Sequence, residues 1–224
     1  MGKYAWGAGD GPITDDGCAV ELYRGLSADG EIEMITSLVP IGGAILDLGA
    51  GAGRLAKPLA RVGFQVTAVD QSADMLAEID GAECVQASIE TLDLTPRHFE
   101  VVLLASYLLN TPDVASRSGL LRSCRRHVQS DGVVLLQVRG PSLLNDIGGS
   151  EWEVAGVLDV VEAYHRTGSQ VTMTWRTEVA GRKWVQTFTH EFLDEAELTT
   201  ALAQEGLRFE GWLDERREWL LAKP

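Results

Sequence analysis

Two carboxylates and three glycines in the first third of the chain have the types and spacing of a ligand-binding site. The glycines occupy alternate positions, Gly49, Gly51 and Gly53, with Asp47 before them and Asp70 after them. Glycines so placed let a ligand approach the backbone closely, because no Cβ stands in the way. An acidic side chain about 20 residues further on can accept hydrogen bonds from both ribose hydroxyls of a nucleoside. The pattern predicts a nucleoside-binding site.

The elements expected around this segment would bring both carboxylates to one edge of a sheet. A buried strand over 44–48 leads into the glycine turn, and a helix runs from the turn to about Val62. A second strand over 65–69 closes on Asp70. We expect the helix to direct free N–H groups and the positive end of its dipole at the ligand.

Two positions indicate which nucleoside cofactor fits. A dinucleotide fingerprint requires a small residue at the sixth position counted from Gly49, but Arg54 stands there. The Asp47 carboxylate would repel a pyrophosphate and attract the ammonium of a methionine moiety. With these features the chain resembles the class I S-adenosylmethionine-dependent methyltransferases of small-molecule type. A nicotinamide or flavin site and a purely structural glycine loop are the alternatives.

The resemblance implies a set of cofactor-binding positions. In similar proteins the residues after the ribose-binding aspartate border the adenine, and residues after the third strand bind its amino group. Ser88 stands where the family usually has aspartate, and Met75 and Tyr23 have the alternative of plain helix packing. The implied positions are Tyr23, Asp47, Gly49, Ala50, Gly51, Gly53, Asp70, Gln71, Met75, Ser88, Ile89 and Ala105.

The acceptor end is less clearly marked, because methyl transfer depends mainly on positioning. The leaving group is neutral, and a general base is needed only for an acceptor that is protonated at neutral pH. Tyr107 and Arg139 follow predicted strands, and Arg139 could clamp a substrate carboxylate. His190 shares a strand face with aromatic residues. The alternatives are a core tyrosine, a surface ion pair and a satisfied core histidine.

Composition narrows the classes of partner. Lysine and arginine number 19 against 33 aspartates and glutamates, giving a net charge of −14 in 224 residues. Nucleic-acid binding depends on basic side chains, so no nucleic-acid partner is expected. No apolar run approaches the roughly 18 residues of a membrane span, and no export signal is evident, so we expect a cytoplasmic protein without a membrane partner. The three cysteines and four histidines have no metal-ligand spacing, so no metal is expected.

The rest of the pattern predicts an α/β fold, a doubly wound Rossmann-like and mainly parallel sheet with an antiparallel C-terminal hairpin. A small antiparallel β insertion follows the fifth strand. The expected segments are an N-terminal helical or lid segment (1–40), the cofactor-binding core (41–140), the insertion as acceptor cover (141–193), and a C-terminal helix and hairpin (194–224).

Single elements can be placed within these segments. Expected helices cover 18–26, 29–39 from an Asp29 cap, a turn capped by Ser72, 111–128 from a Thr111 cap, and a helix from the capping box at Asp194. Expected strands cover 83–87, 99–105, 132–138, 157–167, 170–179, 183–193, 208–213 and 218–222.

The function expected from this resemblance is transfer of a methyl group to oxygen or nitrogen of a small-molecule metabolite by in-line displacement. The alternatives are a protein or peptide (carboxyl) methyltransferase and a non-catalytic cofactor-binding protein. Trp152, Trp175 and Trp184 could line an apolar acceptor pocket or form a dimer contact. We therefore expect a monomer or a homodimer.

Overall fold

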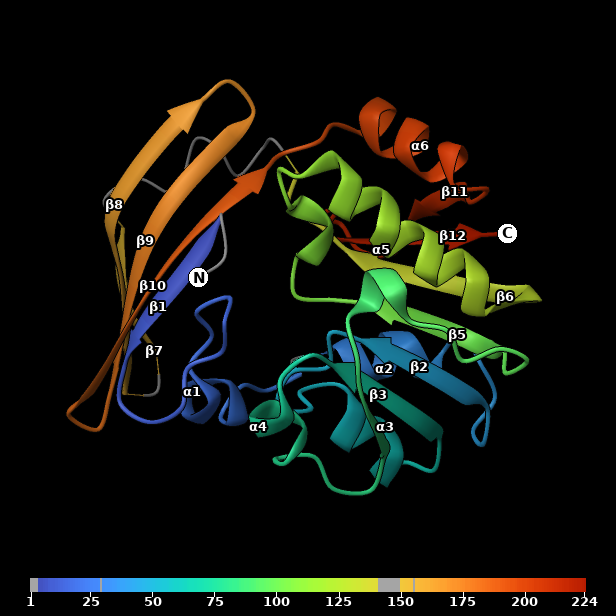
Figure 1. The fold of residues 1–224 in the computed structure, drawn as a ribbon, viewed down its shortest axis with the longest axis horizontal. Helices are drawn as coiled ribbons and strands as arrows, with labels where there is room; N and C mark the ends of the chain where they lie inside the picture. Colours follow the sequence, from blue (N-terminus) through green and yellow to red (C-terminus); the bar gives the residue numbers. More distant parts are fainter. Residues whose placement is uncertain (1–3, 29, 141–149, 155) are drawn as a thin grey trace.

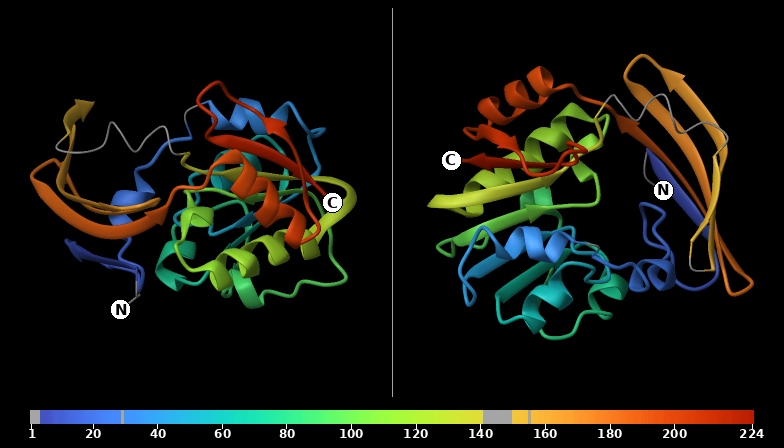
Figure 2. Two further views of the ribbon diagram at one scale, coloured as in Figure 1. Left: turned by 90° about the horizontal axis from the view of Figure 1, so that it is seen from above. Right: turned by 180° about the vertical axis from the view of Figure 1, so that it is seen from behind.

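The computed structural model describes residues 4–28, 30–140, 150–154 and 156–224. Figure 1 shows two β-sheets, a helix-covered seven-stranded sheet and a five-stranded antiparallel sheet that stands across from it. In the two views of Figure 2 the antiparallel sheet forms a separate curved layer, joined to the rest through the N-terminal segment and the chain before the last helix.

The seven-stranded sheet has the order β11-β12-β6-β5-β2-β3-β4. Strands β6, β5, β2, β3 and β4 are parallel, whereas β12 runs antiparallel to both of its neighbours. The strand order reverses between β2 and β5, and ligands of open α/β sheets bind at such a point. The bounds are β2 Ala44–Leu48, β3 Gln65–Asp70, β4 Glu83–Gln86, β5 Phe99–Leu104, β6 Val128–Gln137, β11 Arg208–Trp212 and β12 Trp219–Lys223. The predicted fold class is confirmed.

Each strand buries side chains on both faces, as parallel strands do. In β2, Leu46 and Leu48 belong to the cluster that includes leucines of α5 and α6. Ile45 belongs to the opposite cluster, with residues of α2 and α3. The helices are α2 Glu31–Thr36, α3 Ala56–Arg61, α5 Val114–His127 and α6 Glu195–Gln204. Asp47, two residues after Ile45, is a buried carboxylate on the α2–α3 face.

The helices are shorter than the sequence indicates, and one cap differs. The remaining ones are α1 Val20–Arg24 and α4 Ala73–Leu76, with 3₁₀ turns η1 Ile89–Thr91 and η2 Leu108–Asn110. The predicted Thr111 cap of α5 is wrong, because Asp113 accepts the amides of Ala115 and Ser116. The Ser72 cap and the capping box at Asp194 are confirmed. The predicted Asp29 cap lies outside the described residues.

The antiparallel sheet has the order β1-β10-β9-β8-β7. Its strands are β1 Ala5–Gly9, β7 Glu151–Val154, β8 Val157–Thr167, β9 Gln170–Val179 and β10 Arg182–Glu191. The three-stranded meander is confirmed, but the prediction of a helical or lid segment from the N-terminus is wrong for residues 5–9, which pair with β10. Glycines permit this strand: a Cβ on Gly7 would lie 2.0 Å from the carbonyl oxygen of Gly17.

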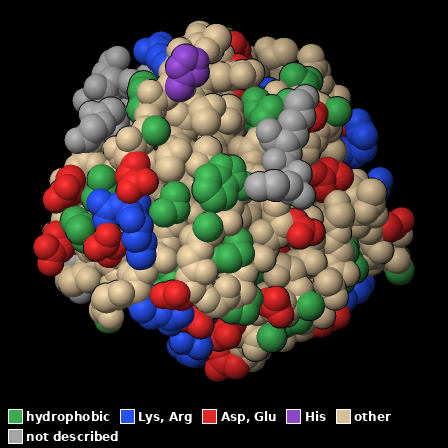
Figure 3. Space-filling model, turned by 60° about the vertical axis from the view of Figure 1, so that its left-hand side comes forward, with side chains coloured by type: hydrophobic (Ala, Val, Ile, Leu, Met, Phe, Trp, Pro, Cys, Tyr) green, Lys and Arg blue, Asp and Glu red, His purple; other side chains and the backbone are tan. Residues whose placement is uncertain are grey.

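The two faces of this sheet differ in character. On the outer face the hydroxyls of Thr172 and Thr189 lie 2.8 Å apart, and those of Thr174 and Thr187 lie 2.9 Å apart. Figure 3 views this side of the molecule, where hydrophobic side chains are scattered among polar and charged ones. The opposite, inner face carries Trp184, Phe188 and His190 of β10, so these rings are directed at the parallel strands.

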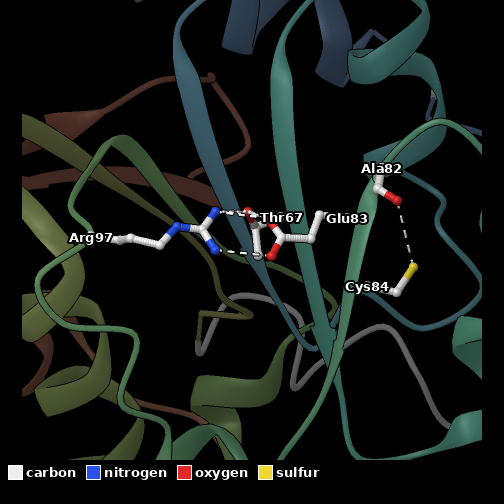
Figure 4. Close-up of polar contacts among 5 residues, drawn as sticks. All are labelled: Thr67, Ala82, Glu83, Cys84 and Arg97. Carbon is white, nitrogen blue, oxygen red and sulfur yellow. Dashed lines mark hydrogen bonds and ion pairs between the residues drawn. The ribbon is translucent and has the colours of Figure 1, made fainter.

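The edge strand β4 is held by polar contacts (Figure 4). Arg97 donates to the Glu83 carboxylate at 2.8 and 3.0 Å, and to the Thr67 hydroxyl of β3 at 2.9 Å. The Cys84 thiol lies 3.9 Å from the carbonyl oxygen of Ala82. These contacts fasten the short strand beside β3, the strand that ends in Asp70.

Candidate functional site

The glycine turn after β2 has one open position. Gly49, Gly51 and Gly53 all have positive φ angles, of 73°, 53° and 84°. A Cβ on Gly49 would lie 2.4 Å from Leu108, and one on Gly53 would lie 2.9 Å from Ile79. A Cβ on Gly51 would meet only the Tyr23 ring, at 3.9 Å. The outer two glycines therefore serve packing, and Gly51 faces open space.

Most amides of the glycine turn itself are already engaged within the protein. The N–H groups of Gly49 and Ala50 both donate to the carbonyl oxygen of Val69, at 2.8 and 2.9 Å. The Gly53 N–H donates to Ala50, and that of Gly51 donates to Asp70. Because these donors are already used, the turn lacks the amide cradle that a pyrophosphate requires.

Asp70 ends β3 beside the open glycine. Its two carboxylate oxygens accept the amides of Gly51 and Ser72, each at 2.9 Å. Burial raises the pKa of this carboxyl, and the two amide hydrogen bonds oppose that effect. A carboxylate has about four lone-pair positions, so acceptor capacity for two hydroxyl groups remains.

Asp47 is the second carboxylate of the site and the more deeply buried. Its side chain is 2% exposed, and its Oδ2 atom has no hydrogen-bond partner among the described residues. Burial raises its pKa to about 7, while the Arg54 guanidinium lowers it and the charge of Asp70 raises it. An orphaned buried carboxylate oxygen fits a cationic ligand group.

Arg54 belongs to a polar network that sequence reasoning missed. Its guanidinium pairs with Glu31 of α2 and donates to Gln137 of β6 at 3.3 Å. Gln137 in turn donates to Glu31 at 3.2 Å and accepts the Ser106 amide at 2.9 Å. The sequence showed Arg54 only as a departure from the dinucleotide fingerprint. The network joins the glycine turn to the ends of β5 and β6.

Of the residues expected to bind the rest of the cofactor, Ile89 and Ala105 lie at the turn or are buried, whereas Gln71 and Ser88 are exposed. Ile89 lies 3.5 Å from the Cβ position of Gly49, at the turn itself. Ala105 is buried at the end of β5. Gln71 and Ser88 are exposed, and the Ser88 hydroxyl donates to Glu90 at 2.6 Å. The polar position after β4 is therefore engaged with its own turn.

The structure places Tyr23 and Met75 in one small cluster. Met75 is 2% exposed and packs with Val20 of α1 and with Ala52 of the glycine turn, which is the core role left open for it. Tyr23 lies beside the turn, and its hydroxyl lies 3.4 Å from Gln186 of β10. Burial raises the pKa of this hydroxyl well above its usual range. Tyr23 thus bridges the glycine turn and the antiparallel sheet.

The three residues predicted for catalysis lie together, although they come from distant parts of the sequence. The Arg139 guanidinium lies over the Tyr107 ring at 4.1 Å from its centroid. The rings of Tyr107 and His190 are 6.5 Å apart, and that of Phe188 is 4.7 Å from His190. Tyr107 has a positive φ of 60°. Such backbone strain in a bulky residue is typical of functional positions.

Both ionisable rings of this group are held neutral. Burial and, to a smaller extent, the charge of Arg139 together lower the pKa of His190 to about 3. The Nδ1 atom of His190 is buried and has no hydrogen-bond partner among the described residues. Burial raises the pKa of Tyr107, and the Arg139 guanidinium opposes that shift. We refer to Tyr107, Arg139 and His190 below as the acceptor group.

Asn110, which follows the fourth predicted strand as Tyr107 does, holds the acceptor group together. Its amide nitrogen donates to the carbonyl oxygens of Arg139 and Glu191, at 2.9 and 2.8 Å. Its amide oxygen accepts the Arg139 N–H at 2.8 Å. The side chain is 2% exposed. It ties the ends of β6 and β10 to the turn that carries Tyr107.

Other predicted features lie outside this arrangement. Trp175 and Trp184 line a cavity of about 30 Å³ beside Tyr23, and Trp152 packs edge-on against Trp175 at 4.9 Å. A groove of about 480 Å³ between α5 and α6 contains none of the predicted site residues. In the described part of the chain no cluster of histidine, cysteine or acidic residues could hold a metal ion. None of the described helices is both long and apolar enough to cross a membrane.

Comparisons with known sequences agree with this geometry. A family model described as a methyltransferase domain matches residues 46–136. A ubiquinone biosynthesis O-methyltransferase of Albidiferax ferrireducens is 33% identical over 135 residues, which cover 54% of this chain and 52% of that protein. One from Methylocella silvestris is 38% identical over 98 residues, covering 40% and 37%. The chain thus spans about half or less of the curated relatives it matches.

Solved structures share the fold over nearly the whole chain. DesVI of Streptomyces venezuelae has a TM-score of 0.72 at 19% identity, covering 91% of this chain and 94% of that one. The sugar N-methyltransferase KedS8 of a Streptoalloteichus species has a TM-score of 0.71 at 21% identity, with coverages of 96% and 97%. At such identities the likeness is one of fold. Residues 46–136 are therefore similar to a methyltransferase domain, and the chain has the fold of solved S-adenosylmethionine-dependent methyltransferases.

Proposed function

We propose that the protein is an S-adenosylmethionine-dependent methyltransferase that methylates oxygen or nitrogen of a small molecule. The observation that carries the proposal is the pair of carboxylates on either side of an open glycine. Asp47 has an orphaned buried oxygen, Asp70 has spare acceptor capacity, and Gly51 leaves room between them. These features fit a ligand with an ammonium group at one end and a ribose further along.

Residue roles follow from this arrangement. The Asp47 carboxylate would attract the ammonium, and Asp70 would accept the ribose hydroxyls while it holds the turn through the Gly51 amide. Ile89 and Ala105 would line the rest of the cofactor surface, with Tyr23 closing it from the side of the antiparallel sheet. When bound, the cofactor supplies an electrophilic methyl group whose transfer leaves a neutral thioether.

The acceptor group would act mainly by positioning. Tyr107 and Arg139 follow β5 and β6, beyond the switch point, while His190 approaches from β10. Held by Asn110, these side chains can orient an acceptor in line with the methyl group, and orientation alone can provide effective molarities of about 10⁵–10⁸ M. His190 is neutral, and its low pKa makes it a weak base, so it would help to orient the acceptor and would not take its proton.

A small acceptor is favoured over a protein or peptide. The antiparallel sheet reaches the acceptor group through Asn110 and the cofactor side through Tyr23, so it covers the ends of the parallel strands at two points. Such a cover suits a small ligand better than a polypeptide. A cytoplasmic location accords with the three free cysteines. The oligomeric state is left open between monomer and homodimer.

Calorimetry with S-adenosylmethionine tests the cofactor part. We expect wild-type protein to bind, and Asp70→Ala to bind about 100-fold more weakly, because hydrogen bonds to a charged acceptor contribute about 1.5–3 kcal/mol each. Asp131→Ala, at an exposed acidic position, is the matched control and should bind as wild type does. Unchanged binding by Asp70→Ala would remove this residue from the site.

A labelled methyl donor tests the transfer. The protein is incubated with methyl-labelled S-adenosylmethionine and a cell extract, and the products are separated by mass. Label in small products supports the proposal, whereas label in polypeptides would favour a protein methyltransferase. Binding without any labelled product would favour a non-catalytic cofactor-binding protein.

A further inference from the structure

The charges at the acceptor group restrict what can bind there. Arg139 brings a permanent positive charge, and within the described part of the chain it forms no ion pair with a carboxylate. The charge of Glu218 also acts on Tyr107 and raises its pKa, but this effect is smaller than that of Arg139. The acceptor end is therefore locally positive in a protein whose net charge is −14.

The other members of the group add no charge that would balance Arg139. Tyr107 and His190 are neutral for the reasons given above. Glu191, the neighbour of His190, points to the opposite face of β10, where it accepts hydrogen bonds from Ser169 and Gln170. Asp159 lies on the same face of the sheet as His190, but it pairs with Thr177 of β9, whereas His190 pairs with Val171. These two partners are six residues apart, so Asp159 lies about 20 Å from His190 at about 3.4 Å per residue.

The shape of the group complements its charge. Tyr107, Phe188 and His190 offer ring faces and edges around the guanidinium, with centroid separations of 4.7 and 6.5 Å. Rings arranged in this way pack well against a flat ligand. The unpartnered Nδ1 atom of His190 is a further acceptor within the same group. A flat ligand with an acidic O–H could, once ionised, pair its oxygen with the guanidinium.

We propose that the acceptor is a planar compound with an acidic hydroxyl, a phenol or an enol, which binds as its oxyanion beside Arg139 and is methylated on oxygen. This inference rests on the proposed function and selects oxygen over nitrogen within it. An ammonium acceptor would stand beside the guanidinium without a compensating carboxylate, which disfavours its binding. A guanidinium and an oxyanion form strong, directional hydrogen bonds.

The transfer balances in charge and atoms. The hydroxyl gives its proton to solvent as the acceptor binds, and the resulting oxyanion attacks the methyl carbon. The new O–C bond forms as the C–S bond breaks, and the bonding pair stays on sulfur. The anion and the sulfonium thus become a neutral methyl ether and a neutral thioether, and the released proton passes to solvent.

Binding of 4-nitrophenol tests the inference without turnover, because its ionised form is yellow. In the presence of S-adenosylhomocysteine, we expect wild-type protein to bind the yellow anion and to lower the pKa of the bound phenol by about one unit or more. Arg139→Gln should lose that shift and bind the anion at least about tenfold more weakly, since one pKa unit is a factor of ten. Arg139→Lys keeps the charge and should retain part of the shift.

Arg182→Gln is the matched control, because Arg182 also lies over an aromatic ring, that of Trp184, at the other end of β10. It should bind nitrophenol as wild type does. Benzylamine is the cationic probe and benzoate the carboxylate probe. Benzylamine bound as tightly as nitrophenol, or an unchanged shift in Arg139→Gln, would overturn the inference. Benzoate bound more tightly than nitrophenol would also overturn it, in favour of a carboxylate acceptor.

The two proposals fail separately. Calorimetry with S-adenosylhomocysteine on the same samples reports whether each variant is folded and binds the cofactor product. Loss of that binding in wild-type protein would contradict the proposed function. Retained cofactor binding without Arg139-dependent nitrophenol binding would contradict only the assignment of the acceptor.

Discussion

The proposed cofactor end and the proposed acceptor end of this site differ in charge and in how the sequence builds them. The cofactor end is acidic, with Asp47 and Asp70 around an open glycine, and its residues follow one another within two strand–turn units. The acceptor end carries the cation Arg139, and its members come from β6, β10 and the turn after β5. One end depends on local sequence, and the other depends on tertiary structure.

The difference in charge has a physical consequence. Burial and the charge of Asp70 both raise the pKa of Asp47, so this carboxylate would be stabilised by a cationic ligand group. The acceptor end lowers the pKa of His190 and favours anions. A positive methyl donor and a negative acceptor would thus each meet the opposite charge, and neither would be attracted to the other's place.

Gly51→Val gives the largest expected effect and breaks the cofactor end alone. A branched side chain at a φ of 53° is strained and would project into the open space beside Tyr23. We expect cofactor binding, measured by calorimetry, to fall at least about 100-fold. Gly168→Val is the matched control, with a φ of 62° and open surroundings in the β8–β9 turn. It shares the backbone strain and should bind normally.

The same variant pair separates strain from occlusion. If both valine variants bind the cofactor equally well, the glycine turn faces something other than the ligand. If Gly51→Val loses binding and still binds nitrophenol, the two ends are independent. That outcome would sharpen the contrast between them.

Asn110→Ala breaks the acceptor end and has the next largest effect. The substitution removes three hydrogen bonds that hold Arg139 and Glu191. We expect kcat for the acceptor found in the labelling experiment to fall about 10- to 100-fold, because a misplacement of about 1 Å can cost that much. Cofactor affinity should change less than about twofold, since one end is untouched.

Asn110→Asp is the informative companion, because it retains the oxygen that accepts the Arg139 amide. It loses the donor to the two carbonyl groups, so kcat should fall as in the alanine variant while the fold is kept. A purely structural role would lower the melting temperature without separating kcat from cofactor affinity. Equal loss of both quantities would show that Asn110 does not act through the acceptor group.

Sequence reasoning succeeded where structure is local. The Ser72 cap and the Asp194–Glu197 capping box were predictable, because each depends on residues three apart. The same holds for the strand and glycine turn that carry Asp47. The α5 cap was misplaced because Thr111 and Asp113 are both good capping residues, and only the folded turn selects the second.

Sequence reasoning failed where segments that are distant in the sequence come together in the fold. β1 was missed because its glycines weaken the strand pattern. The reason for a glycine at position 7 is visible only in the fold, where the backbone of Gly17 leaves no room for a Cβ. Arg54 and Asn110 gave no motif, since their partners lie on other strands. The position of Asn110 shortly after the fourth predicted strand indicated a place near the acceptor, but its hydrogen-bond partners could not be predicted. The acceptor group was predicted residue by residue, but its proximity was not.

The smallest expected effect is a pH dependence that belongs to the cofactor end only. The pKa of Asp47 in the free protein is raised to about 7 by burial. Its proton therefore stabilises the free fold at low pH, and this contribution is lost as pH rises through about 7. An ammonium ligand needs the ionised carboxylate, so cofactor binding must release the proton. Affinity should fall by about tenfold per pH unit below about pH 7.

Calorimetry between about pH 7 and about pH 5.5 in two buffers of different ionisation enthalpy would measure both the affinity and the released proton. Asp47→Asn should bind weakly at all of these pH values, with no proton release. Glu83→Gln is the control, because the pKa of Glu83 is lowered by Arg97 and the residue is remote from the turn. Nitrophenol binding by Asp47→Asn should still depend on Arg139, because Asp47 does not determine the charge at the acceptor end. If Asp47→Asn still releases a proton on cofactor binding, Asp47 is not the titrating group. Asp70, whose pKa is also raised, would then be the pH-sensitive carboxylate.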